Sequence, residues 1–164
     1  MIRRVVSCAA MCATLLLVSV GSAVAASHGA GTETITEHFR DEVAFAEESP
    51  NPCTGEPGTF TALAKNGKVH VTTQADGELW VTGTFEGTAV FTPAEPGGVS
   101  ASGHFTNWFG VSLNQKNSVE HSTGTFHLTG SDGSRITVHM TEHISTNARG
   151  ELTVSFEKLH TSCG

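Results

Sequence analysis

Histidine is the residue type whose number and spacing in this sequence most suggest chemistry. The chain has nine histidines, and imidazoles together with carboxylates are the ligands that zinc and copper prefer. Pairing the predicted strands places His121 opposite His143, and Glu157 opposite His139. Because residues four apart lie about 13 Å apart along a strand, His139 and His143 cannot share one ion. We expect a solvated face of histidine and threonine without a cofactor, and keep a metal site at His121, His139, His143 and Glu157 as the alternative.

Polar residues also interrupt the apolar face of the predicted strands. Successive strand residues point to opposite sides of a sheet. Counting along each predicted strand puts four polar residues on the same side as neighbouring valine, isoleucine and phenylalanine residues, namely Glu37, Asp41, Asn107 and Glu142. A buried carboxylate is costly unless it is paired, so Glu142 would need Lys158 or a histidine near it. A polar cluster in an apolar interior is how a pocket orients a small ligand. The alternatives are that these residues turn out to water at strand ends or bulges, or that the carboxylates serve acid/base catalysis.

Alternation along the predicted strands places two tryptophans on the polar face. Trp80 and Trp108 fall on neighbouring predicted strands, within diagonal reach of each other. Exposed tryptophans stack on sugars or anchor a protein partner, although a loop or terminus often covers such a ring. The sequence has no Gly-x-Ser-x-Gly motif and no glycine-rich loop before a helix, so we do not predict an enzyme.

The strands that position these residues follow one another almost without interruption. Valine, threonine, isoleucine and phenylalanine alternate with polar residues, and turn sequences separate the runs. The pattern predicts an all-β domain of eight antiparallel strands that closes into an up-and-down barrel, with a two-sheet sandwich as the alternative. The first strand is expected at residues 33–47. The turns are expected at Asn66-Gly67, Ala75-Asp76-Gly77, 92–98, Gln115-Lys116, Ser131-Asp132-Gly133 and Asn147-Ala148-Arg149.

The N-terminus predicts export. Arg3 and Arg4 precede an apolar run at residues 9–20, and Ala23-Val24-Ala25 forms a small-x-small cleavage site. We expect residues 1–25 to be a signal peptide, residues 26–32 a flexible N-terminus, and residues 33–164 one secreted domain. Cleavage leaves seven Lys and Arg against 16 Asp and Glu, a net charge of about −9. That charge argues against nucleic acid and anionic membranes as partners, and we expect a monomer.

Two cysteines remain after the predicted cleavage. In an oxidising compartment Cys53 and Cys163 should form a disulfide. In a strict meander these residues would lie at opposite ends of the barrel. We therefore predict that the first strand bends near Arg40-Asp41-Glu42, so that it is really two strands.

The run Asn51-Pro52-Cys53-Thr54-Gly55-Glu56 also carries a family resemblance. Together with later strand and turn motifs, it resembles a family of small secreted bacterial proteins that have an N-P-C-x-G-E motif and no assigned activity. The resemblance covers roughly residues 43–163. It implies a secreted β-barrel with one disulfide, and it implies no catalytic residues. Our functional hypothesis is binding of a small or extended ligand in or on the barrel. The alternatives are a surface interaction module built on the tryptophan and histidine face, or an acid/base enzyme.

Overall fold

The computed structural model of the chain describes residues 31–164. The predicted signal peptide, and residues 26–30 of the predicted flexible N-terminus, lie outside the described residues. Residues 31–164 are all-β and contain no helix, so no helix there could span a membrane. The eight strands are β1 (Glu33–Phe39), β2 (Glu42–Glu48), β3 (Gly58–Thr73), β4 (Leu79–Pro93), β5 (Ala101–Leu113), β6 (Asn117–Gly130), β7 (Arg135–Asn147) and β8 (Leu152–Cys163).

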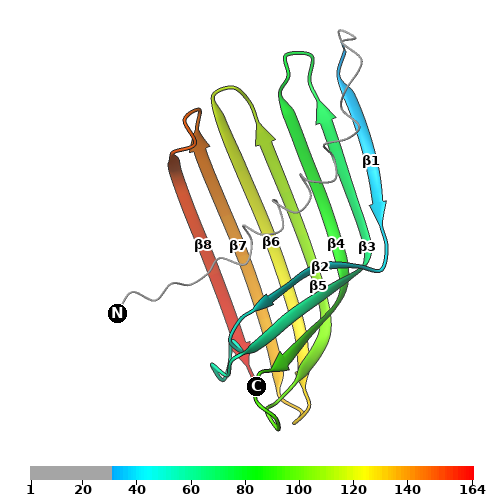
Figure 1. Cartoon of the computed structure of the whole chain (residues 1–164), viewed down its shortest axis with the longest axis vertical. Coiled ribbons are helices and arrows are strands. Elements are labelled where there is room, and N and C mark those ends of the chain that lie inside the picture. Colours follow the sequence, from blue (N-terminus) through cyan, green and yellow to red (C-terminus); the bar gives the residue numbers. More distant parts are fainter. Residues whose placement is uncertain (1–30) are drawn as a thin grey trace.

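The strands form one antiparallel meander from β3 to β8, which confirms the predicted topology (Figure 1). β1 and β2 both pair with β3, β1 along its second part and β2 along its first. The predicted bend in the first strand is therefore confirmed. At the bend Asp41 has a φ of 56°, a left-handed conformation that aspartate tolerates better than most residues.

The predicted hairpin turn at Asn66-Gly67 is wrong, because β3 runs unbroken through this dipeptide. The pairing of β3 with β4 shifts between Ala64 and Asn66, so the dipeptide follows a β-bulge. Glycine is needed at position 67 because a Cβ there would lie 2.6 Å from the Phe85 ring. The total of eight strands is still correct. The predicted strand at residues 33–47 is two strands, as its predicted bend requires, and the two strands predicted on either side of Asn66-Gly67 are one.

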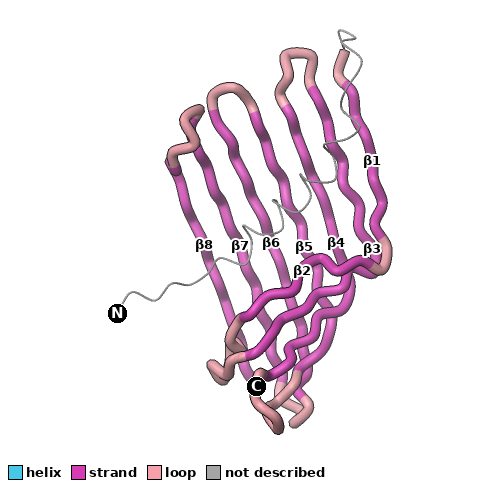
Figure 2. Tube along the Cα trace, in the orientation of Figure 1, coloured by secondary structure: helices cyan, strands magenta, loops and turns pink. Residues whose placement is uncertain are grey.

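The sheet does not close into a barrel, so that part of the prediction is wrong. Among the described strands, neither β1 nor β2 pairs with β8. Instead β2 and the first part of β3 cross over the ends of β5–β8, while the rest of the sheet extends as a single layer (Figures 1 and 2). This arrangement is compatible with the sandwich alternative: one end of a bent sheet is folded over the other.

The sheet has two faces, because successive strand residues point to opposite sides. We call the side that carries Phe91 and Phe105 the core face, and the side that carries Trp80 and Trp108 the outer face. The crossing segment covers the core face at one end of the sheet. There Phe45 of β2 makes edge-on contacts with the Phe105 and Phe126 rings at 6.4 and 6.1 Å. The buried cluster consists of Phe60, Ala62, Ala64, Ala89, Phe91, Ala101, Phe105, Leu128, Ile136 and Val138.

The predicted disulfide joins the crossing segment to the last strand. Cys53 and Cys163 are bonded, with their Cα atoms 5.9 Å apart. Buried Asn51 orders the loop that presents Cys53, because its Oδ1 accepts the Cys53 and Thr54 amides at 2.9 and 3.2 Å. The N-P-C-T-G-E run is thus a hydrogen-bonded turn that ties the folded-over layer to β8.

A second bulge decides which way β8 faces. The pairing of β7 with β8 shifts between Ser145 and Thr146. A shift of one residue turns every side chain of a strand to the other face. Val154 and Phe156 consequently have outer-face register, and they are about half exposed at 46% and 50%.

Candidate binding site on the outer face

The histidines of the described chain gather on the outer face. All eight have outer-face register, and three cross-strand pairs place one histidine directly opposite another. The pairs are His104 with His127, His121 with His143, and His139 with His160. The predicted opposition of His121 and His143 is therefore confirmed.

Glu157 does not join these histidines, so its predicted place opposite His139 is wrong. The bulge in the last hairpin turns Glu157 to the core face, where it lies opposite Glu142. For the same reason Lys158 has outer-face register and lies opposite Thr141, not near Glu142. In residues 31–164 no group of three or more histidine, cysteine, aspartate or glutamate side chains is arranged to hold a metal ion.

Charge is divided between the two faces. On the outer face of β1 and β3–β8 the cations are Lys68, Arg135 and Lys158, and the single carboxylate is Glu86; β2 adds Glu48 at its edge. Seven glutamates have core-face register, and apart from Lys65 at the bulge no lysine or arginine of the described strands accompanies them. These glutamates are Glu33, Glu37, Glu42, Glu47, Glu120, Glu142 and Glu157. The outer face therefore has a local excess of positive charge on an acidic protein.

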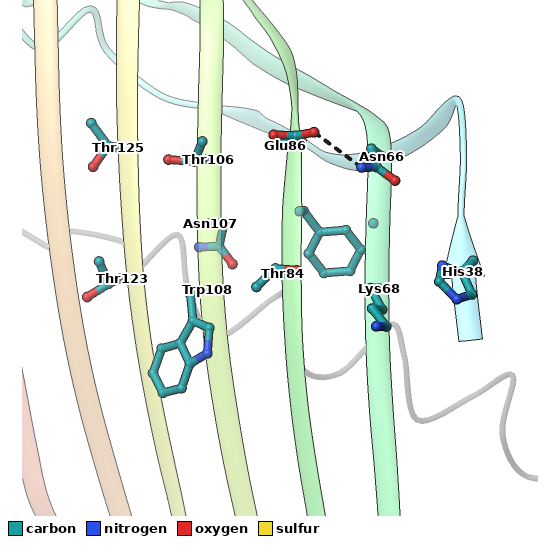
Figure 3. Close-up of a pocket in the computed structure, with 12 residues that line it drawn as sticks. His38, Asn66, Lys68, Thr84, Glu86, Thr106, Asn107, Trp108, Thr123 and Thr125 are labelled. Carbon is teal, nitrogen blue, oxygen red and sulfur yellow. Dashed lines mark hydrogen bonds between the residues drawn. The ribbon is translucent and has the colours of Figure 1, made fainter. Parts of the chain in front are cut away.

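A shallow groove of about 550 Å³ crosses five neighbouring strands of the sheet beside the β3 bulge (Figure 3). Side chains with outer-face register line it, namely His38, Asn66, Lys68, Thr84, Glu86, Thr106, Trp108, Thr123 and Thr125. Asn66 donates a hydrogen bond from Nδ2 to Glu86 Oε1 at 3.2 Å. Gly67, Phe85 and Asn107 also border the groove, although the side chains of Phe85 and Asn107 have core-face register. We call this depression the outer-face groove.

The two tryptophans are both exposed, but the structure does not bring them together. Trp108 lies opposite Thr84, while Trp80 lies opposite Ser112. Four residues therefore separate them along β4, which is about 13 Å. Trp108 lines the outer-face groove and its ring centroid is 5.5 Å from that of His121. Of the two, Trp108 is the one placed to contact a ligand in the groove.

The three carboxylates that were considered for the interior lie in different environments. Asp41 is at the exposed bend, where an ion pair with Lys65 at 2.8 Å lowers the pKa of its carboxyl. Asp41 is therefore turned out to water at the end of a strand, which is one of the alternatives that the sequence analysis kept open, and it does not line an interior pocket. Glu37 is exposed on the core face. Glu142 is buried, with 4% of its surface exposed.

Two residues near Glu142 were missed by the sequence analysis. Ser122 lies directly opposite Glu142 with 6% exposed surface, and its hydroxyl has no hydrogen-bond partner within residues 31–164. Burial, and then the Glu142 charge, raise the pKa of the Glu120 carboxyl. Neither residue is within a motif, so only the register of β6 against β7 could have indicated this cluster.

The sequence analysis also missed four groove residues, His38, Asn66, Lys68 and Glu86. The predicted turn at Asn66-Gly67 gave no indication that these residues share one face of the sheet.

Comparisons with models of known protein families, with curated proteins and with solved structures found no match. The site's chemistry must accordingly be argued from its own residues.

Proposed function

We propose that this protein is an exported binding protein that takes an extended acidic polysaccharide in the outer-face groove. The observation that carries the proposal is Trp108, a 42% exposed indole in a groove bordered by threonine hydroxyls and Lys68. An indole offers an apolar plane to the C–H face of a sugar ring. Threonine, asparagine and histidine side chains supply donors and acceptors for its hydroxyl groups.

The shape of the groove favours an extended chain over an enclosed small molecule. The groove is shallow, and its lining residues come from five neighbouring strands, β1, β3, β4, β5 and β6 (Figure 3). The end of the core face that the crossing segment covers is, by contrast, filled by the largest fully buried side chains, Phe91 and Phe105. A surface that leaves both ends of a ligand free suits a segment of a polymer.

The charge of the outer face favours an acidic polymer over a neutral one. Lys68 is in the groove, and Arg135 and Lys158 share its face. Glu86 also lines the groove, so the attraction comes from the whole outer face, where Lys68, Arg135 and Lys158 outnumber the carboxylates Glu86 and Glu48. A surface with a net charge of one sign raises the local concentration of oppositely charged ligands. The proposal includes export with removal of residues 1–25, which the Cys53–Cys163 disulfide supports because disulfides persist outside the cytosol.

Affinity measurements with polygalacturonate and with neutral dextran test this function. We expect polygalacturonate to bind more tightly, and its affinity to fall when NaCl is raised, because salt screens exposed charges. Trp108→Ala should weaken binding about threefold to tenfold, the value of one aromatic contact. Lys68→Ala should weaken it as well, whereas Lys116→Ala in the β5–β6 turn is the matched control. Equal affinity for dextran, or affinity that does not depend on Trp108, would contradict the proposal.

A further inference from the structure

The His121–His143 pair differs from the other two opposed histidine pairs. The His121 and His143 rings face each other with centroids 5.8 Å apart. Both side chains are partly buried, whereas His104, His127, His139 and His160 are exposed. Trp108 borders one side of the pair, and Phe156 lies directly opposite His143 on the other.

The ring nitrogens of this pair are uncommitted in residues 31–164. Threonine hydroxyls engage Nδ1 of other outer-face histidines, His70 at 2.8 Å, His139 at 3.0 Å and His127 at 3.3 Å. No such bond holds the His121 or His143 ring within the described chain. Each ring therefore retains a nitrogen whose lone pair can bind a cation.

The ring separation matches the requirement for shared coordination. With nitrogen–metal bonds of about 2.0–2.1 Å, a bound ion lies about 3.2 Å from each ring centroid, and two rings in a tetrahedral arrangement have centroids about 5.2 Å apart. The observed 5.8 Å is within reach of that value after a small rotation of either side chain. Since the two residues are on adjacent strands of one sheet, the backbone already holds them at chelating distance.

We propose that His121 and His143 chelate a divalent transition-metal ion, Cu²⁺ more tightly than Zn²⁺. Imidazole suits both ions, and copper forms the stronger complexes with a given set of nitrogen ligands. Two protein ligands leave the remaining positions to water or to a bound molecule, so the site is open and exchangeable. The inference is independent of the outer-face groove's ligand.

Trp108 provides a direct readout, because a Cu²⁺ ion between the histidines would lie close to its indole and quench its fluorescence. The test is a Cu²⁺ titration of tag-free protein that carries Trp80→Phe, which leaves Trp108 as the sole tryptophan. We expect saturable quenching by Cu²⁺ that an excess of the chelator EDTA reverses. His121→Ala and His143→Ala should each raise the Cu²⁺ dissociation constant at least tenfold.

His70→Ala is the matched control, since His70 shares the outer face but is bonded to Thr36 and has no histidine opposite it. It should leave the Cu²⁺ affinity unchanged. The two test variants lie on different strands, so one remains informative if the other fails to fold. Absent quenching, quenching that survives both His121→Ala and His143→Ala, or an equal loss with His70→Ala would overturn the proposal.

Discussion

The two faces of this sheet are built from different sets of side chains. The core face carries the phenylalanines that pack beneath the crossing segment, together with seven glutamates of the described strands. The outer face carries the histidines of the described chain, both tryptophans, most of the strand threonines, and Lys68, Arg135 and Lys158. The buried side chains of the core face account for much of the folding stability, whereas the outer-face side chains are exposed or only partly buried along most of β4 and β5. The proposed function accordingly assigns recognition to the outer face.

The sharpest contrast is between adjacent residues of β5. Phe105 is fully buried on the core face, and Thr106 is exposed on the outer face. Phe105→Ala should lower the free energy of unfolding by about 3–5 kcal/mol, because it removes apolar burial and leaves a cavity. Thr106→Ala should change it by no more than about 0.5 kcal/mol. Urea denaturation of both variants measures the difference, and similar losses for the two would end the distinction between the faces.

The disulfide holds the layer that covers the core face. Replacing both Cys53 and Cys163 by serine should cost about 2–5 kcal/mol of unfolding free energy, because the bridge closes a long loop in the unfolded chain. The sequence separation of the two cysteines is 110 residues. Thermal denaturation with and without reductant checks the cost. Two free thiols in the unreduced protein, detected by mass spectrometry, would contradict the arrangement of this layer.

The orientation of β8 gives a smaller effect. Because the bulge at Ser145 and Thr146 turns Phe156 outward, Phe156→Thr should cost less than about 1 kcal/mol. A regular hairpin without the bulge would place Phe156 on the core face, and its loss would then cost several times more. Chemical denaturation of Phe156→Thr beside Phe105→Ala as the buried reference decides between the two registers.

Glu120 gives the smallest effect and tests the polar part of the core face. Its carboxyl has a pKa raised above the ordinary 4.5, mainly by burial and then by the Glu142 charge. The folded state therefore binds this proton more tightly than the unfolded state, and the free energy of unfolding falls as the pH rises from 4.5 through the raised pKa. Glu120→Gln should raise the melting temperature slightly at pH 7 and leave it unchanged at pH 3.5. An equal shift at both pH values would assign the effect to packing and not to charge.

Much of the architecture could be predicted from alternation and turn residues. The register of His121 against His143 follows from turn length, and it is confirmed. The disulfide followed from the two cysteines that remain after the predicted cleavage, and the bend at Asp41 followed from requiring that Cys53 reach Cys163. In each case the constraint is local or covalent, which is why one sequence is enough to state it.

The features that were not predicted depend on bulges and on long-range packing. A bulge adds one residue to a strand without a turn signature in the sequence. Counting alternate residues therefore could not show that Phe156 and Glu157 lie on the faces opposite to those expected. The Asn66-Gly67 dipeptide reads as a turn, although contact with the Phe85 ring is the reason for its glycine. The prediction of a closed barrel was wrong because β1 does not pair with β8. The start of β3 instead folds across the sheet (Figure 1).

The most direct test of the claim that recognition belongs to the outer-face groove uses its tryptophan as the reporter. Two single-tryptophan variants, Trp80→Phe and Trp108→Phe, are titrated with polygalacturonate while their fluorescence is followed. The proposed function predicts a saturable change in the Trp108 emission of Trp80→Phe, and no change in the Trp80 emission of Trp108→Phe, because Trp80 is about 13 Å away along the strand. A constant Trp108 emission, or equal changes for both tryptophans, would contradict it.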